Sequence, residues 1–370
     1  MPMEDLGIDE KYPGATLTKR LSDVVGSYTY FAEGDVLLAK ITPCFENGKL
    51  GIAKGLKNGI GFGSSEFIVL RPDRTLSKDW LYYFLSREDF RTEGAERMGG
   101  AVGQQRVSKE FVESYPIPLP PLPEQQRIVG LLDEAFAGLA TAKANAEQNL
   151  QNARALFESH LQSVFTRRHK EWVEKPLAEL CESGRIITYG VVQLGNEVPG
   201  GVPCLRTSNV RWLRIETEGM KRIAPKLSAS YSRTVLRGGE VLVNVRGTLG
   251  GVGVTNEAMK GWTISREVAV VPVDSRVVDP RFVAFSIGGG ASQAWLGRMK
   301  KGAAYVGINI EDLRNLPVHV PGLGEQTEII LRLERCQSET QRLESLYQQK
   351  LAALEALKKS LLHHAFTGNL

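Results

Sequence analysis

The sequence repeats itself, and this duplication limits the possible architectures more than any other feature. Residues 64–73 align with residues 265–274 without a gap, an offset of 201 residues (64 to 265). Both segments are rich in β-branched and apolar residues, as strands are. The match ends with Phe165-Thr166 over Phe366-Thr367. A chain built in this way is expected to contain two related domains rather than one core.

The register of the repeat is expected to hold through Leu81, which aligns with Phe282 at the same offset. Upstream, residues 34–37 align with residues 239–242 at an offset of 205 (34 to 239). The first copy therefore carries four extra residues (205 less 201) between residues 40 and 63.

The second copy has an opening segment, residues 170–206, with no counterpart in the first copy. We expect the first domain to be truncated at its amino end and to lack one or two edge strands. An incomplete sheet leaves an exposed edge and a smaller core.

Each copy divides into a strand-rich part and a long segment typical of a helix. Residues 124–166 and 325–367 contain no proline, which indicates one continuous helix in each copy. The expected fold class is α+β, with two mainly β domains, each followed by a long helix. The predicted boundaries are 1–120 for the first domain, 121–168 for its helix, 169–321 for the second domain and 322–370 for its helix.

Apolar residues recur in both long segments at steps of three and four, as in a coiled coil. In the second segment they are Leu343, Tyr347, Leu351, Leu354, Leu357 and Leu361. In the first they are Ile128, Leu132, Ala135, Leu139, Ala142, Ala146, Leu150, Ala153, Phe157 and Leu161. We expect the two helices to pair antiparallel about a pseudo-twofold axis. The alternative is a helix that pairs with a second copy of the chain.

Signatures of catalysis are absent from the sequence. Pro120-Pro121 follows Leu119, which does not fit the motif of an adenine methyltransferase, and Gly48-Lys49-Leu50 does not complete a P-loop. The four cysteines lie far apart, which fits neither a zinc site nor a disulfide framework. No cofactor, metal or catalytic residue is predicted. The lack of a long apolar run predicts a cytoplasmic location.

The net charge of +4 is compatible with binding a polyanion without requiring it. A more specific signal is the segment 119–128, Leu-Pro-Pro-Leu-Pro-Glu-Gln-Gln-Arg-Ile. It resembles the junction between target-recognition domain and spacer helix in specificity subunits of Type I restriction-modification systems. Residues 34–40 and 361–370 are also similar to this family.

The resemblance implies a non-catalytic subunit that reads a bipartite target in double-stranded DNA. It also implies association with two modification (methyltransferase) subunits and, in the full complex, with restriction translocase subunits. S-adenosylmethionine would then belong to the partner. The family normally opens with a segment like residues 172–180, and the first copy departs from it by having none.

Residues that contact DNA do not follow from the resemblance, so they are predicted from local chemistry. Base edges are read best by Arg, Lys, Asn and Gln, and phosphates by basic and hydroxyl groups. The predicted residues are Lys40, Thr42, Asn47, Lys49, Gln104, Gln105, Arg106, Arg206, Asn209, Arg211, Asn244, Arg246, Thr248, Arg266, Lys300, Lys301, Tyr305 and Asn309. Each of them could equally be an ordinary solvated side chain. A competing hypothesis for the whole chain is a coiled-coil scaffold whose β domains bind proteins.

Overall fold

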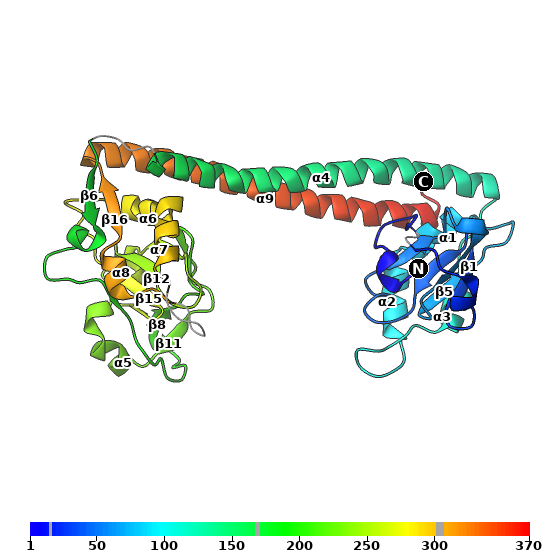
Figure 1. Cartoon of the computed structure of the whole chain (residues 1–370), viewed down its shortest axis with the longest axis horizontal. Coiled ribbons are helices and arrows are strands. Elements are labelled where there is room, and N and C mark those ends of the chain that lie inside the picture. Colours follow the sequence, from blue (N-terminus) through cyan, green and yellow to red (C-terminus); the bar gives the residue numbers. More distant parts are fainter. Residues whose placement is uncertain (15–16, 167–170, 301–306) are drawn as a thin grey trace. The chain divides into compact units, whose positions relative to one another are not determined.

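The computed structural model describes residues 1–14, 17–166, 171–300 and 307–370. The chain divides into two compact units (Figure 1). Unit 1 comprises residues 1–148 and 347–370, and unit 2 comprises residues 149–346.

Unit 1 contains a three-stranded antiparallel sheet in the order β3-β2-β5 and a separate pair, β1-β4. The strands are β1 (Thr29–Ala32), β2 (Val36–Ala39), β3 (Leu50–Ile52), β4 (Ile60–Gly63) and β5 (Phe67–Leu70). The short helices are α1 (Lys78–Leu85), α2 (Glu88–Glu96) and α3 (Lys109–Ser114), and 3-10 turns lie at Met3–Asp5, Leu21–Asp23 and Lys57–Gly59.

Unit 2 is built on a four-stranded sheet in the order β13-β12-β15-β7, with smaller sheets β11-β8-β14, β10-β9 and β16-β6. Its first strands are β6 (Val173–Pro176), β7 (Thr188–Tyr189), β8 (Val202–Leu205), β9 (Val210–Arg211), β10 (Arg214–Ile215) and β11 (Lys221–Ile223). The others are β12 (Val241–Asn244), β13 (Val252–Val254), β14 (Thr263–Ile264), β15 (Val268–Val271) and β16 (Pro317–Val320). The helices are α5 (Pro225–Ser230), α6 (Pro280–Gly288), α7 (Gly290–Arg298) and α8 (Ile310–Arg314), with 3-10 turns at Leu177–Leu180, Ser232–Thr234 and Glu257–Met259.

The central sheets of the two units differ by one strand. Strands β6, β7 and β8 all come from the opening segment that only the second copy has. Strand β7 pairs with β15, whereas β5, which corresponds to β15, pairs only with β2 among the strands of the described residues. The expectation of fewer strands in the first copy is confirmed.

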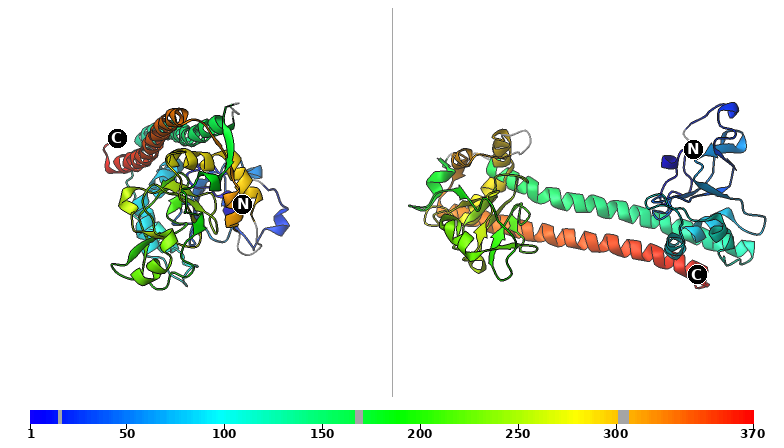
Figure 2. Two further views of the ribbon diagram at one scale, coloured as in Figure 1. Left: turned by 90° about the vertical axis from the view of Figure 1, so that its left-hand side faces the viewer. Right: turned by 90° about the horizontal axis from the view of Figure 1, so that it is seen from below.

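The two long helices are α4 (Leu122–Thr166) and α9 (Leu323–Thr367), and they run in opposite directions (Figures 1 and 2). Residues 122–148 of α4 share unit 1 with the end of α9, and the rest of α4 shares unit 2 with its beginning. The expected antiparallel pairing is confirmed, and with it the α+β fold class.

Two of the small residues of α4 that were predicted to face a partner helix are buried, whereas Ala135 and Ala142 are half-buried. Ala146 is 1% exposed and Ala153 is 5% exposed. One position of the predicted stripe on α9 is wrong, because Leu357 is 48% exposed. The covered position is Lys358, whose ammonium lies 2.6 Å from Asp9. A lysine stem can fill an apolar position while its charged end reaches a carboxylate.

A buried glutamine joins the start of each long helix to its own unit. The Gln125 side chain accepts a hydrogen bond from the Ser77 N–H (2.8 Å), and Gln326 accepts one from the Asp279 N–H (2.8 Å). Both glutamines are 0% exposed. The two glutamines align at an offset of 201 residues (125 to 326). The residues whose N–H groups they bind align at an offset of 202 (77 to 279).

The aromatic core shows the same shift. Trp80 packs on Phe366 with ring centroids 4.3 Å apart, and Phe282 packs on Phe165 at 5.4 Å. Trp80 therefore corresponds to Phe282 (80 to 282), and the expected alignment of Leu81 with Phe282 is wrong by one residue.

The extra residue of unit 2 lies in the turn before α6. Asp73 accepts a hydrogen bond from the Thr75 N–H (2.8 Å), and Asp274 accepts one from the Arg276 N–H (3.0 Å). The buried glutamine amides then reach the carbonyl oxygens of Thr75 and Val277. The turn is one residue longer in unit 2, and such changes are tolerated in turns because their backbone is solvated.

The repeated Gly-Asp and Gly-Glu motif supplies a buried carboxylate to each unit. Asp35 is 2% exposed and is bound by the Arg71 guanidinium through two 2.7 Å hydrogen bonds. Glu240 is 2% exposed and receives a 2.8 Å hydrogen bond from Arg185. Because Pro272 stands where Arg71 stands in the first copy (71 to 272), unit 2 takes its guanidinium from the opening segment.

Within the described residues, none of the helices is long and apolar enough to cross a membrane.

Candidate nucleic-acid interface

Each unit has an isolated β-bridge beyond the end of its central strand, and each bridge carries an arginine. Ile41 pairs with Arg106 in unit 1, and Arg246 pairs with Gly307 in unit 2. The two bridges correspond, since 41 matches 246 at the offset of 205 and 106 matches 307 at 201. The guanidinium comes from opposite partners of the same bridge. We define these as the bridge arginines.

The bridge arginine of unit 1 lies among other predicted contact residues. Its Nε and Nη2 donate to the Glu66 carboxylate at 3.0 and 2.8 Å, and Lys40 Nζ lies 3.9 Å from that carboxylate. The hydrogen bonds from Arg106 hold the pKa of Glu66 below its usual value. Two cations thus share one anion, and Arg106 keeps 41% of its side chain exposed. This surface is suited to a phosphate or to a base edge.

The neighbouring polar residues divide into two groups. Thr42 joins the bridge through its N–H, which donates to the Gln105 carbonyl oxygen (2.9 Å), and Gln104 is exposed beside it. Lys49 instead donates to the carbonyl oxygen of Met3 (2.8 Å). Thr42, Gln104 and Gln105 therefore lie together at the bridge, whereas the Lys49 ammonium binds the amino-terminal segment.

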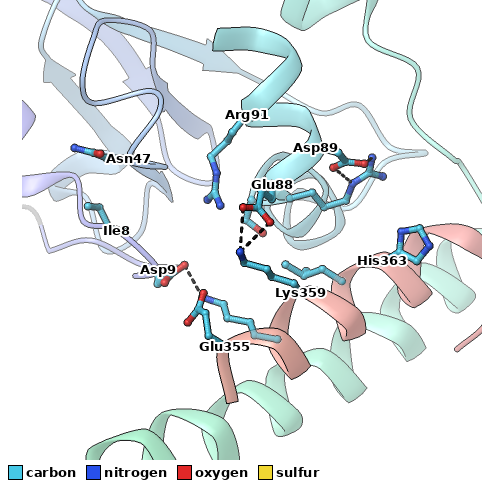
Figure 3. Close-up of a pocket in the computed structure, with 13 residues that line it drawn as sticks. Ile8, Asp9, Asn47, Glu88, Asp89, Arg91, Glu355, Lys359 and His363 are labelled. Atoms are coloured by element: carbon cyan, nitrogen blue, oxygen red, sulfur yellow. Dashed lines mark hydrogen bonds and ion pairs between the residues drawn. The ribbon is translucent and has the colours of Figure 1, made fainter. Parts of the chain in front are cut away.

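Asn47 lines a different hollow of unit 1, formed by the amino-terminal segment, α2 and the end of α9 (Figure 3). Its walls carry both signs of charge. Lys359 pairs with Glu88 at 2.9 Å across the hollow, and Arg91 also faces it (Figure 3). Asn47 is exposed there, away from the group around Arg106.

The bridge arginine of unit 2 lies over an aromatic ring. The Arg246 guanidinium carbon is 5.6 Å from the ring centroid of Tyr189, a cation–π distance. Thr248 is exposed in the same loop, and Arg266 lies 3.5 Å from Glu267. Glu267 corresponds to Glu66 (66 to 267), so both units place a carboxylate near their bridge.

Two predicted contact residues of unit 2 lie in the interior. Asn209 and Asn244 are each 1% exposed. The Asn244 amide donates to the carbonyl oxygens of Val210 (3.0 Å) and Thr248 (3.0 Å), and the Asn209 amide donates to that of Glu216 (3.2 Å). This burial is at odds with the expectation that these amides read base edges. They hold the loops that carry neighbouring side chains.

The remaining predicted residues of unit 2 lie on its surface or at its turns. Arg206 donates to the Gly219 carbonyl oxygen (3.1 Å), and Arg211 lies 3.2 Å from Glu216. Asn309 caps α8, and Lys300 is exposed. Lys301 and Tyr305 lie outside the described residues.

Sequence reasoning missed three side chains close to the bridges. Tyr30 and Lys109 line one groove with Lys40 and Arg106 in unit 1, and Tyr189 lies under Arg246 in unit 2. Lys109 directly follows Ser108, the cap of α3, which corresponds to Asn309 (108 to 309). That shared cap was the signal that could have drawn attention to Lys109.

No group of three or more metal-ligating side chains occurs among the described residues. Burial raises the pKa of Cys181 to about 11 and that of Cys204 to about 12, so both thiols are protonated at neutral pH.

Comparisons with known proteins agree with the duplication. The family model described as Type I restriction modification DNA specificity domain matches residues 12–151 and again residues 169–355. The specificity subunit of the type I restriction enzyme EcoBI from Escherichia coli is 26% identical over 292 residues. That alignment covers 73% of this chain and 61% of the relative, so the chain spans less than two thirds of that relative's length.

Solved structures share the fold. One, from work on complex assembly and conformational transition of the type I R-M system, has a TM-score of 0.74 at 23% identity and covers 94% of this chain and 85% of its own. The HsdS subunit from Thermoanaerobacter tengcongensis has a TM-score of 0.65 at 22% identity and covers 100% and 90%. At these identities, the likeness concerns the arrangement of strands and helices.

Proposed function

Because the chain belongs to the family of Type I restriction modification DNA specificity domains, we propose that it reads a bipartite DNA target for a restriction-modification complex. Each unit reads one half of the target. The chain contributes recognition, and the methyl transfer with S-adenosylmethionine is carried out by modification subunits bound to it. Restriction translocase subunits join in the complete assembly, which acts in the cytoplasm.

The observation that carries this proposal is the pair of bridge arginines. Arg106 and Arg246 belong to corresponding β-bridges of the two matched domains, although they are opposite partners of that bridge. A guanidinium offers two parallel donors, and this fork fits the O6 and N7 acceptors of guanine. In each unit, the bridge therefore carries one arginine that can recognise a base, although that arginine comes from a different segment in the two units.

The surrounding residues support contacts with the DNA backbone. Lys40, Thr42 and Gln104 lie around the first bridge, and Thr248 and Arg266 lie around the second. Lys300 adds an exposed cation to unit 2. Contacts to phosphates fix the register of a protein on the duplex without reading sequence, and they make binding weaken with salt.

The test is reconstitution with a modification subunit. The complex should transfer methyl groups from S-adenosylmethionine to one bipartite sequence, and each partner alone should be inactive. Methylation by the purified chain alone would contradict the division of labour proposed here. If the reconstituted complex bound all duplexes with equal affinity, the chain would instead be a scaffold whose β domains bind proteins.

A further inference from the structure

The backbone around Arg246 is held by the segment on the other side of its bridge. Arg246 pairs with Gly307, and beside this pair the Ile308 N–H donates to the Val245 carbonyl oxygen (2.7 Å). A Cβ on Gly307 would lie 3.1 Å from Cγ of Arg246, which is tighter than an ordinary contact. A glycine at this position therefore leaves room for the stem of the arginine to lie against the opposite segment.

The two bridge arginines differ in what lies against the guanidinium. In unit 1, Nε and Nη2 of Arg106 donate to the Glu66 carboxylate. In unit 2, no carboxylate of the described residues pairs with the Arg246 guanidinium, which lies over the ring of Tyr189 with its carbon 5.6 Å from the ring centroid. A ring attracts a cation through its face and accepts none of the in-plane hydrogen bonds that a carboxylate would take. The ring thus holds Arg246 without a carboxylate competing for its N–H donors.

The ring of Tyr189 is carried by a short strand that is anchored on both sides. Before it, the carbonyl oxygen of Ile187 accepts a hydrogen bond from Arg314 (2.9 Å), and Ile187 is 1% exposed. After it, a Cβ on Gly190 would lie 1.8 Å from the Ile264 carbonyl oxygen, so the strand passes directly over that backbone. Tyr189 itself is 39% exposed. Its ring is therefore a surface group on a fixed backbone, beside the bridge.

We propose that Tyr189 is a positioning residue for base recognition by Arg246. This inference rests on the proposed function and adds to it a side chain that acts through the arginine. A guanidinium that is already held over a ring loses less rotamer freedom when it binds a base edge. Contacts to phosphates carry no sequence information. Tyr189 therefore acts on the selectivity between sequences more than on the affinity for DNA in general.

The experiment uses the chain reconstituted with a modification subunit and pairs of duplexes that differ by one base pair. The half of the target that Arg246→Ala relaxes is the half in which the base pair is changed. The measured quantity is the ratio of the two Kd values, which a lower folded fraction of a variant does not alter because both duplexes meet the same sample. Tyr189→Leu keeps an apolar side chain but removes the ring, and we expect the ratio to fall about two- to tenfold. Tyr189→Phe keeps the ring and should preserve the ratio within about twofold.

A double-mutant cycle separates positioning from a general effect on the fold. In the Arg246→Ala background, Tyr189→Leu should cause no further loss of selectivity, because the guanidinium that the ring holds is gone. Equal losses in the two backgrounds would overturn the inference, since Tyr189 would then act on the fold of unit 2 or touch the DNA itself. The half of the target that unit 1 reads serves as the internal control, and Tyr189→Leu should leave its recognition unchanged.

Nuclear magnetic resonance tests the ring contact without DNA. The Nε–H resonance of Arg246, identified by its loss in Arg246→Ala, should be displaced by the ring current and should move in Tyr189→Leu. An unchanged resonance would overturn the inference.

The outcomes also separate this inference from the proposed function. If Arg246→Ala relaxed one half of the target and Tyr189→Leu did not, the positioning role would be wrong and the proposed function would stand. If the parent complex showed no preference between duplexes, the proposed function would fail and the positioning role with it.

Discussion

At the scale of single residues, the carboxylate of Glu240 is a buried charged group that joins several segments of unit 2. It is buried and receives hydrogen bonds from Arg185, from the N–H groups of Arg237 and Gly238, and from the Thr255 hydroxyl. Burial raises its pKa, but the hydrogen bonds outweigh burial and hold the pKa below the usual value of 4.5. A buried carboxylate with this many donors is costly to protonate in the folded state.

We therefore expect unit 2 to lose stability in acid. A carboxyl whose pKa is lower in the folded state stabilises the fold above its unfolded pKa, and this contribution is lost as the pH falls through the folded pKa. The melting temperature should decline below about pH 4.5. The variant Glu240→Gln should be about 1–3 kcal/mol less stable at pH 7 and should depend less on pH. Thermal unfolding from pH 3 to 7 measures both effects.

The control is Glu182→Gln, because Glu182 also binds Arg185 but is 42% exposed. Its melting curve should follow that of the parent. An equal pH dependence in the parent and in Glu240→Gln would mean that other carboxylates govern acid unfolding.

A second prediction at this scale concerns Asn244. Its replacement by alanine leaves the carbonyl oxygens of Val210 and Thr248 without their buried donor. We expect a loss of about 1–3 kcal/mol in the free energy of unfolding and weaker recognition of one half of the target. Thr248→Ala, which keeps its backbone carbonyl, should not alter stability. If Asn244→Ala left stability unchanged and relaxed the choice of one base, a direct base contact would be the better explanation.

At the scale of elements, the spacing of the long helices depends on small side chains. Ala146 is 1% exposed in the middle of α4, the helix that pairs with α9. A larger residue there would push the two helices apart, since a close-packed interior cannot accept extra volume without strain.

We expect Ala146→Leu to lower the free energy of unfolding by about 1–3 kcal/mol. The matched control is Ala144→Leu, because Ala144 lies two residues away on the exposed face. It should change stability by no more than about 0.5 kcal/mol. Urea unfolding followed by circular dichroism at the helix band compares the two. Equal effects of both substitutions would show that the covered face is not tightly packed.

At the scale of the whole molecule, the chain contains two related domains in which different residues fulfil the same structural roles. Asp35 takes its guanidinium from Arg71, and Glu240 takes its own from Arg185. The bridge arginine likewise comes from a different segment in each unit. Such divergence within a kept fold is what two separate targets would require.

We expect each bridge arginine to govern one half of the DNA target. Arg106→Ala should relax one half, and Arg246→Ala should relax the other, each by about 1–3 kcal/mol of discrimination if the contact is bidentate. Mapping of methylated sites by sequencing, with the reconstituted complex, identifies the half affected. The variants Arg106→Lys and Arg246→Lys keep the positive charge but lose the two parallel donors of the guanidinium. They should therefore retain more of the affinity for DNA than of the selectivity between sequences. If a single substitution altered recognition of both halves of the target, one composite DNA-binding surface would explain the result better than two separate ones.

The sequence by itself determined the duplication and the two long helices, and it favoured their antiparallel pairing over pairing with a second copy of the chain. These features are periodic, and periodicity reflects local backbone geometry and the need to bury one face of each helix. The seam of α4 was predictable for this reason, because every third or fourth residue of a helix returns to the same side. The prediction was wrong at Leu357, because the alkyl stem of Lys358 takes the covered position while its ammonium binds Asp9.

Only the tertiary structure decided which polar side chains face outward. Asn244 and Arg246 are two residues apart in one segment, yet the first is buried by carbonyl groups from residues 207 and 210, and the second lies beside the bridge. The one-residue shift before α6 could not be predicted either. In each case the deciding partner is remote in the chain, and a hydrogen bond between remote segments leaves no periodic trace in the sequence.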